Sequence, residues 1–475
     1  MSLSSRVFRA GLWVGLAFGF SRIIGLFRLT FLAHFLLPSD FGLITLVTLV
    51  VSSMWVLSDT GTSASVIQKV NPTPAFLHTA WHMNWVRGLV LALLCWLLAP
   101  FAAVFFESPQ LQVLLQWAAL IPFIQGFESL GLVLLKKELS FKQKTYIDFT
   151  RETVQTIVSI LLVIYWQASA ESILWGIIAG VLASSVLSYF LHHFRPSGQF
   201  SRTSALEIWR YGGHLMGSGI LVFAMTNLDD MVVGKIMGVD QLGYYGVAFT
   251  LAAILTNQLV QIFNMVMFPA LSEIQDDVQR IQYILGLSVR LMAGILTPVV
   301  CFVLLFPEAL IGFVLGEKWL PAASVFVVLL CMGWVRGVAT VFGPVLMARK
   351  RTAVMHKMKW IEFTLFGVLI LPAVYGFGLV GAAIVLLLVY CLSLALHMRA
   401  VQTELGGDYT SFVRQILSGT MPGFSAFVFT WFIALLVPKL GVLLIGFLYL
   451  SVWLMITWLR ERDFMMQLVT MVKSK

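Results

Sequence analysis

Long apolar runs separated by short polar breaks follow one another along almost the entire chain. Most runs hold about 20 residues, which is enough for an α-helix to cross a hydrocarbon layer of ~30 Å. Membrane β-barrels show shorter segments of alternating polarity instead. Cutting at polar, Pro or Gly breaks predicts spans at residues 10–36, 41–67, 79–105, 110–135, 147–167, 171–193, 210–237, 241–270, 284–306, 320–347, 357–376, 379–398, 413–436 and 440–459. We therefore expect an all-α polytopic membrane protein with about fourteen transmembrane helices.

The composition excludes a soluble protein. Hydrophobic residues fill 59% of the 475 positions and charged residues only 11%, whereas soluble domains are ~45–50% apolar. The first run follows Arg6 and Arg9, as in a signal peptide. A small-residue cleavage site does not follow it, so we expect a retained first helix.

The net charge of +9 fits either nucleic acid or a membrane surface, and the placement of the positive residues decides between them. Alternation of the spans assigns every connection to one side. One side carries Lys69, Lys136, Lys137, Lys142, Lys144, Arg195, Arg202, Arg280, Arg349, Lys350, Arg351, Lys357, Lys359 and Arg399, together with the basic residues of both termini. The other carries only Lys318 and Lys439, with Lys235 at its margin. Because positive residues gather inside, we expect a cytoplasmic (inner) membrane protein with both termini cytoplasmic and no nucleic-acid partner.

Two short segments recur about 200 residues later in the chain. Ser39-Asp40-Phe41-Gly42 recurs as Asp240-Gln241-Leu242-Gly243, and the stretch at 133–137 recurs at 345–350. The repeat predicts two equivalent six-helix bundles, helices 1–6 in residues 1–200 and helices 7–12 in residues 201–400. Helices 13 and 14, in residues 401–475, would be an addition. Since helices 1 and 7 start on the same side, the bundles would be related by an axis along the membrane normal.

Four motifs, in this order, resemble one known family. They are Gly61–Lys69 at the end of helix 2, Asn227–Lys235 in helix 7, and Leu242–Ala248 and Phe268–Ser272 in helix 8. The chain resembles the polysaccharide-transporter (Wzx-like) branch of the multidrug/oligosaccharidyl-lipid/polysaccharide exporter superfamily over most of helices 1–12. The resemblance implies a flippase for lipid-linked oligosaccharides.

Helix 1 also resembles the lipid II flippases of the same superfamily, through the stretch from Ser21 to Arg28. In those proteins arginines of this motif line a cationic cavity, and the resemblance implies that role for Arg22 and Arg28. Leu29 stands where their pattern has an acidic residue, so lipid II itself is not the implied substrate.

Four of the arginines within predicted spans are candidate substrate contacts: Arg22, Arg28, Arg87 and Arg336. A charge at this depth normally faces a partner or a wet cavity because burying it in lipid is costly. A guanidinium offers a planar fork of donors that suits diphosphate oxygens. These residues therefore suggest a polyprenyl-diphosphate carrier. The structural alternative is an ion pair or a snorkelling side chain, and Asp59 lies at a similar depth to Arg87.

Acidic and amide residues complete the predicted site. Asp59, Asp229 and Asp230 are candidates to bind a coupling cation or proton, or else to pair with basic neighbours. The amides of Asn227, Asn257 and Gln261 could bind sugar hydroxyls or bond between helices. We expect neither a metal site nor a cofactor, because the sequence contains no established metal or nucleotide motif.

The sequence predicts a transporter that exports a lipid-linked saccharide by alternating access. One alternative is a cation-coupled drug antiporter of the same superfamily. Another is a membrane polysaccharide polymerase or ligase, which the short outer connections disfavour. The expected partners are the lipid-linked saccharide and membrane lipids, with a polysaccharide polymerase and a chain-length regulator as further candidates.

Overall fold

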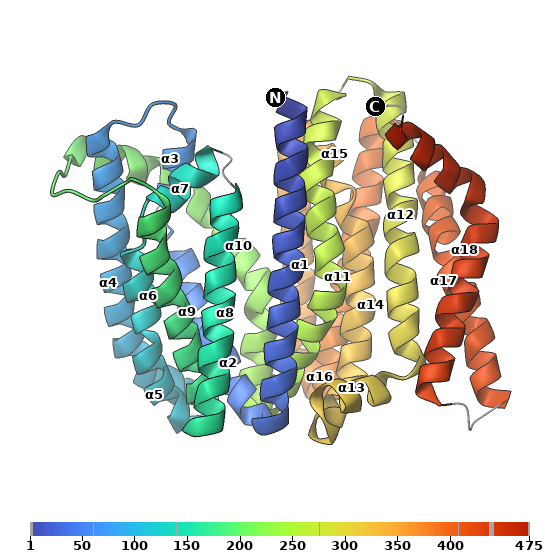
Figure 1. Cartoon of the computed structure of the whole chain (residues 1–475), viewed down its shortest axis with the longest axis horizontal. Helices are drawn as coiled ribbons and strands as arrows, with labels where there is room; N and C mark the ends of the chain where they lie inside the picture. Colours follow the sequence, from blue (N-terminus) through green and yellow to red (C-terminus); the bar gives the residue numbers. More distant parts are fainter. Residues whose placement is uncertain are drawn as a thin grey trace. The chain divides into compact units, whose positions relative to one another are not determined.

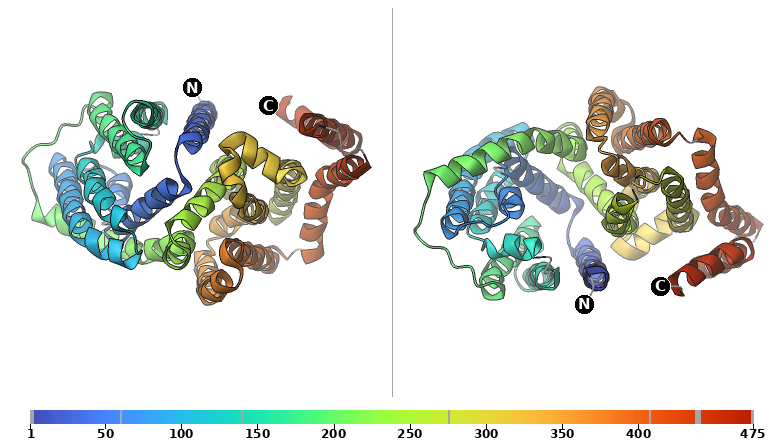
Figure 2. Two further views of the ribbon diagram at one scale, coloured as in Figure 1. Left: turned by 90° about the horizontal axis from the view of Figure 1, so that it is seen from below. Right: turned by 90° about the horizontal axis from the view of Figure 1, so that it is seen from above.

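The computed structural model describes residues 3–59, 61–138, 141–274, 276–406, 408–436 and 441–473, and every regular element in these ranges is helical (Figure 1). The chain divides into two compact units. Unit 1 comprises Met1–Val247 and Phe366–Ala382, and unit 2 comprises Ala248–Leu365 and Ala383–Lys475. Seen along the helices, each unit is a bundle of neighbouring helices (Figure 2).

Unit 1 holds the first half of the helices. They are α1 (Leu3–Phe35), α2 (Pro38–Leu57), α3 (Thr62–Gln68), α4 (Pro74–Phe105), α5 (Pro109–Ala118), α6 (Leu120–Gly126), α7 (Gly131–Lys137), α8 (Phe141–Tyr165), α9 (Ala170–Leu191), α10 (Arg202–Met237) and the start of α11 (Val239–Glu273). Capping side chains fix some of the helix starts. The Thr73 hydroxyl accepts a hydrogen bond from the Phe76 amide at α4, and Ser201 caps α10 in the same way.

Unit 2 holds the rest of α11 and the helices that follow. They are α12 (Val278–Leu305), α13 (Pro307–Leu315), the 3₁₀ helix η1 (Glu317–Ala322), α14 (Ala323–Thr340), α15 (Gly343–Ala348), α16 (Thr352–Leu405), α17 (Tyr409–Leu436) and α18 (Val442–Lys473). The middle of α16, from Phe366 to Ala382, belongs to unit 1.

Each of the fourteen predicted spans overlaps one of these helices or a broken run of them. By length and composition, seven described helices can cross a membrane, or eight if the bent run from α5 to α7 is one span. The prediction of an all-helical, multi-pass protein is confirmed. The number fourteen stays a prediction, since helices such as α8 and α10 carry several charges in their sequences.

The structure breaks two predicted spans and joins two others. The span at 41–67 ends as α2 at Leu57 and resumes as α3 after Gly61, whose φ of 64° is left-handed. The span at 110–135 bends by 58° before α7. The spans at 357–376 and 379–398 form one helix, α16, kinked at Gly378 with φ 61°. Hydropathy records only apolarity, so it does not register these changes of backbone direction.

The starts of α2 and α11 pack against each other reciprocally within unit 1. A Cβ at Gly42 would lie 1.9 Å from the carbonyl oxygen of Val239, and a Cβ at Gly243 would lie 1.8 Å from that of Pro38. Both contacts pair positions with the same offset of 201 residues (239 minus 38 and 243 minus 42). Only glycine allows the two backbones to approach this closely.

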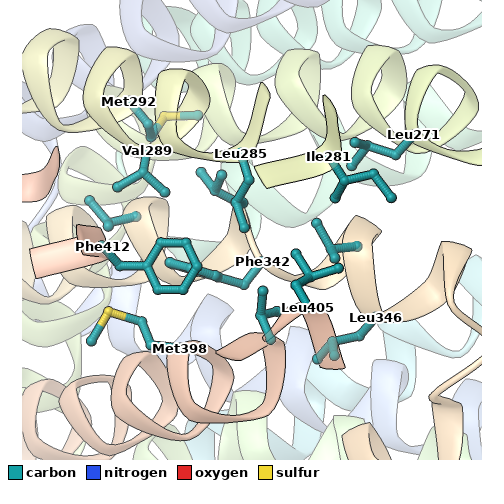
Figure 3. Packing of buried hydrophobic residues seen from close by; sticks show 14 of the residues in the cluster. Leu271, Ile281, Leu285, Val289, Met292, Phe342, Leu346, Met398, Leu405 and Phe412 are labelled. Carbon is teal, nitrogen blue, oxygen red and sulfur yellow. The ribbon is translucent and has the colours of Figure 1, made fainter. Parts of the chain in front are cut away.

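Unit 2 is built around an apolar core between α12, α14, α15, α16 and α17. Figure 3 shows Ile281, Leu285 and Val289 of α12 facing Phe342 and Phe412, whose rings meet edge to face at 5.5 Å. In a membrane such side chains stabilise the contact between helices through close van der Waals packing. The core therefore sets the position of α12 relative to α17. It thereby also sets the position of the polar residues on the other face of α12.

Candidate functional site

Arg28 is held in an ion pair between α1 and α8. Its Nη1 atom lies 3.0 Å from Oε2 of Glu152 and also donates to the Thr156 hydroxyl at 3.4 Å. The two side chains are 18% and 32% exposed. Arg22 lies six residues earlier, about 120° round the helix, and its side chain is exposed. The structure thus separates the two helix-1 arginines: one is paired with an acid, and the other is accessible.

Arg87 of α4 holds the end of α2. Its Nε donates to Ser58 Oγ at 3.0 Å, Nη2 donates to the Trp55 carbonyl at 2.6 Å, and Nη1 lies 3.6 Å from Asp59 Oδ1. The guanidinium also stacks 4.2 Å from the Trp55 ring centroid. The structural alternative considered for Arg87, an ion pair with Asp59, is therefore present. These contacts stabilise the point where α2 stops and α3 begins.

Arg336 belongs to unit 2, on α14. Its guanidinium carbon lies 5.7 Å from the ring centroid of Tyr390 on α16, within the range of a cation–π contact. The side chain is half-buried. Among the described residues, the contact given for this guanidinium is with an aromatic ring, whereas Arg28 and Arg87 contact carboxylates.

Asp229 and Asp230 of α10 have different surroundings. Asp229 is 2% exposed, and its Oδ2 accepts a hydrogen bond of 2.7 Å from the Tyr245 hydroxyl of α11. Its Oδ1 has no hydrogen-bond partner among the described residues. Asp230 is half-buried and, as an adjacent helix residue, points about 100° away. Asp229 is therefore the more enclosed of the two carboxylates.

Of the three amide candidates, only one has a side chain within the described residues. The Asn227 amide donates to the Phe223 carbonyl at 2.9 Å and to the Thr226 hydroxyl at 2.8 Å, both on its own helix. The side chains of Asn257 and Gln261 lie outside the described residues. In the described chain, the structure therefore gives contacts for Asn227 alone among the three.

A further ion pair lies at the C-terminal end of α10. Lys235 Nζ is 2.7 Å from Oε1 of Glu107, in the connection between α4 and α5. The hydrogen bond and the charge of Lys235 lower the pKa of the Glu107 carboxyl, which keeps it ionised near neutral pH.

Sequence reasoning missed the partners of Arg28 and Asp229. Glu152 and Tyr245 emerge as partners only from the structure. Glu152 is an acid within the predicted span 147–167. Its place inside a span is the signal that could have indicated an ion-pair partner. Its partner on α1 is 124 residues away, which no local pattern encodes. Among the described residues, no group of three or more His, Cys, Asp or Glu could hold a metal ion.

The fold matches solved membrane transporters. The structure titled "Lipid II flippase MurJ, inward closed conformation" aligns with a TM-score of 0.77 and 13% identity, over 96% of this chain and 99% of that one. An inward-facing multidrug resistance MATE family transporter of the MOP superfamily aligns with a TM-score of 0.64 and 12% identity, over 81% and 94% of the two chains. At these identities the likeness shows the fold alone. The chain is therefore a multi-pass helical membrane protein with a fold like that of these two transporters.

The sequence comparisons give the family within that class. A model described as "Polysaccharide biosynthesis protein" matches residues 31–324. Lipopolysaccharide biosynthesis protein WzxC of Escherichia coli (strain K12) is 26% identical over 419 residues, covering 87% of this chain and 84% of that protein. Probable low-salt glycan biosynthesis flippase Agl15 of Haloferax volcanii is 22% identical over 284 residues, 59% of each chain. The chain belongs to this polysaccharide biosynthesis protein family, and the resemblance drawn from the sequence motifs is confirmed.

Proposed function

We propose that the protein flips a lipid-linked oligosaccharide, a precursor of a cell-surface polysaccharide, across the cytoplasmic membrane. The observation that carries this is the family match over residues 31–324 together with the related sequence of WzxC along most of the chain. The fold is one that transporters use, and the function needs no enzymatic step.

The transport mechanism we propose is alternating access. Two parallel-related six-helix bundles, residues 1–200 and 201–400, expose a polar chamber first to the cytoplasm and then to the outside, while helices 13 and 14 complete fourteen spans. The reciprocal glycine contacts at a common offset of 201 residues support the repeat on which this depends. The polyprenyl tail stays in lipid while the saccharide crosses within the chamber.

The arginines bind the diphosphate in this proposal. Arg22 is accessible and Arg336 is half-buried, so both can meet a ligand with little rearrangement. Arg28 and Arg87 are engaged with acids that balance their charges, so they contribute stiffness more than direct contact. The enclosed carboxylate of Asp229 is the coupling-ion candidate that the geometry favours over Asp59 and Asp230.

Contacts that join the ends of α3 and α7 to each other and to the start of α10 support the proposed orientation. Lys137 at the end of α7 donates to the Val66 carbonyl at 3.2 Å, and Lys69 after α3 lies 2.7 Å from Glu207 of α10. These basic segments therefore lie on one face of unit 1. By the positive-inside rule that face is cytoplasmic. An even number of spans then places both termini in the cytoplasm as well.

A drug antiporter is the second candidate, because MATE transporters share the fold. An organic cation would be repelled by a chamber lined with guanidinium groups. A variant separates the two functions. If Arg22→Ala leaves surface glycan intact but changes dye efflux from cells, the antiporter is favoured.

The direct test uses inside-out vesicles that contain the protein. They also contain the lipid-linked saccharide made by the same cells that produce the protein. We expect the saccharide to become inaccessible to a membrane-impermeant carbohydrate label over time, because the protein moves it into the lumen. Vesicles without the protein are the control. Failure to move any lipid-linked glycan, in a protein whose deletion leaves surface polysaccharide unchanged, would reject the proposal.

A further inference from the structure

A polar pocket of about 470 Å³ lies within unit 2, between α12 and α17. Its wall on α12 is a stripe at helical spacing that runs from Gln279 through Gly286 to Arg290. The opposite wall comes from Asp408, just before α17, and from Ser411 and Gln415 on α17. The pocket is in the size range of small-molecule sites, ~300–1,000 Å³. It contains none of the residues in the site described above.

The shape of the pocket follows from two glycines. Beyond Arg290 the backbones meet, because a Cβ at Gly419 would lie 2.3 Å from the Arg290 carbonyl oxygen. One turn earlier, a Cβ at Gly286 would be 3.7 Å from the Gln415 amide, so glycine leaves space there. The eleven steps from Gln279 to Arg290 along the helix give the stripe a length of about 16 Å. The pocket therefore extends along α12 from the helix start to that close contact.

Polar groups form a larger share of the lining than in typical drug pockets, which are mainly apolar. Three glutamine amides, the Tyr283 and Ser411 hydroxyls, the Asp408 carboxylate and the Arg290 guanidinium outnumber Leu287 and Phe412. The opposite face of α12 carries Leu285 and Val289 into the core. Polar side chains packed between two helices are costly unless they meet polar partners, so the stripe favours a hydrogen-bonding ligand.

The charges of the pocket select a neutral ligand. Hydrogen bonds from the Thr410 hydroxyl and amide lower the pKa of Asp408, so it is ionised at neutral pH. The one acidic side chain of the lining balances its one guanidinium. A phosphate would meet the Asp408 carboxylate, and an organic cation would meet Arg290. Sugar hydroxyls donate and accept hydrogen bonds, and so do glutamine amides.

We propose that this pocket binds a sugar unit of the lipid-linked saccharide, a subsite of the function proposed above that lies entirely within unit 2. The amides of Gln279 and Gln415 bond neighbouring hydroxyls, while Gln282 is held in place by its bond of 2.9 Å to the Leu405 carbonyl. The exposed ring of Tyr283 covers one face of the sugar. The inference rests on the proposed function for the identity of the ligand.

Two variants test the site in the full chain, reconstituted in nanodiscs. Gly286→Leu fills the pocket, and Gln415→Leu removes one amide while keeping a similar volume. The probe is the water-soluble oligosaccharide released by mild acid from the lipid-linked precursor of the producing cell. Its binding is measured by thermophoresis, beside that of polyprenyl diphosphate. Gly367→Leu is the control, because a Cβ there meets open space.

We expect the wild type and Gly367→Leu to bind the oligosaccharide alike, and both pocket variants to bind it at least about tenfold more weakly, as the loss of one or two hydrogen bonds implies. Binding of polyprenyl diphosphate should not change. Equal oligosaccharide binding by all four proteins, or absence of binding by the wild type, would overturn the inference. So would an equal loss of polyprenyl diphosphate binding, which would assign the pocket to the lipid phosphate.

Vesicle transport separates this failure from failure of the proposed function. If the wild type moves the lipid-linked saccharide and the pocket variants move it at the same rate at subsaturating substrate, only the subsite is wrong. If the wild type moves none, the proposed function fails first.

Discussion

Arg28 and Glu152 show how a charged side chain is kept inside a spanning helix. An unpaired charge at this depth costs from ~2.5 to more than 10 kcal/mol. The pair satisfies both groups through a hydrogen bond of 3.0 Å between helices that are far apart in sequence. Removing one partner alone would leave the other as an uncompensated charge.

We expect Arg28→Gln to lower the free energy of unfolding by about 2 kcal/mol. This is less than the ~3–5 kcal/mol typical of fully buried pairs, because both side chains remain partly exposed. Thermal unfolding of the purified protein, followed by tryptophan fluorescence, measures the change. The double variant Arg28→Gln with Glu152→Gln should recover most of the loss. A single variant as stable as the wild type would show that the pair contributes nothing.

Replacing Arg22, in contrast to Arg28, should affect transport and not stability. Its side chain is exposed, so Arg22→Gln should leave the Tm unchanged. If it binds the diphosphate, the variant should flip lipid-linked saccharide at least about tenfold more slowly, because a charge-assisted bond is worth ~1.5–3 kcal/mol. Arg22→Lys should keep part of the rate, since it keeps the charge but not the fork. Transport at the wild-type rate by Arg22→Gln would remove this residue from the site.

At the scale of helices, the crossing of α2 and α11 depends on two glycines. Gly42→Ala and Gly243→Ala each place a methyl group under 2 Å from a backbone carbonyl, so the helices must separate. We expect both variants to lower the Tm by similar amounts, because the two contacts are equivalent. Gly25→Ala is the control: its Cβ meets open space, and alanine favours a helix by ~1 kcal/mol. Unequal losses at the two positions would contradict the equivalence.

The helices could be predicted from the sequence to a large extent, and their interruptions could not. Apolar runs located every long helix because crossing lipid demands them. The bends at Gly61 and Gly378 depend on single left-handed residues that hydropathy ignores. The arginines of the candidate site were found through their cost in lipid. Glu152 and Tyr245 were missed as partners because the contact, and not the residue type, gives them their role.

At the scale of the whole molecule, transport requires a defined orientation in the membrane. The proposed topology puts the connection between α9 and α10 in the cytoplasm and α13 outside. Gln199 and Glu308 are exposed positions in these two segments. Among the native cysteines, Cys391 is exposed and Cys331 is half-buried, so labelling requires a background in which all four are replaced by alanine.

We expect Glu308→Cys in that background to react with a membrane-impermeant maleimide in intact cells, and Gln199→Cys to react only after the cells are permeabilised. The physical reason is the concentration of lysine and arginine in the connections on the Gln199 side, which resist translocation. Surface glycan produced by each variant shows that the labelled protein is folded and active. Labelling of Gln199→Cys in intact cells would invert the proposed orientation. Labelling of both positions from the same side would mean that an odd number of spans has been misassigned between residues 199 and 308.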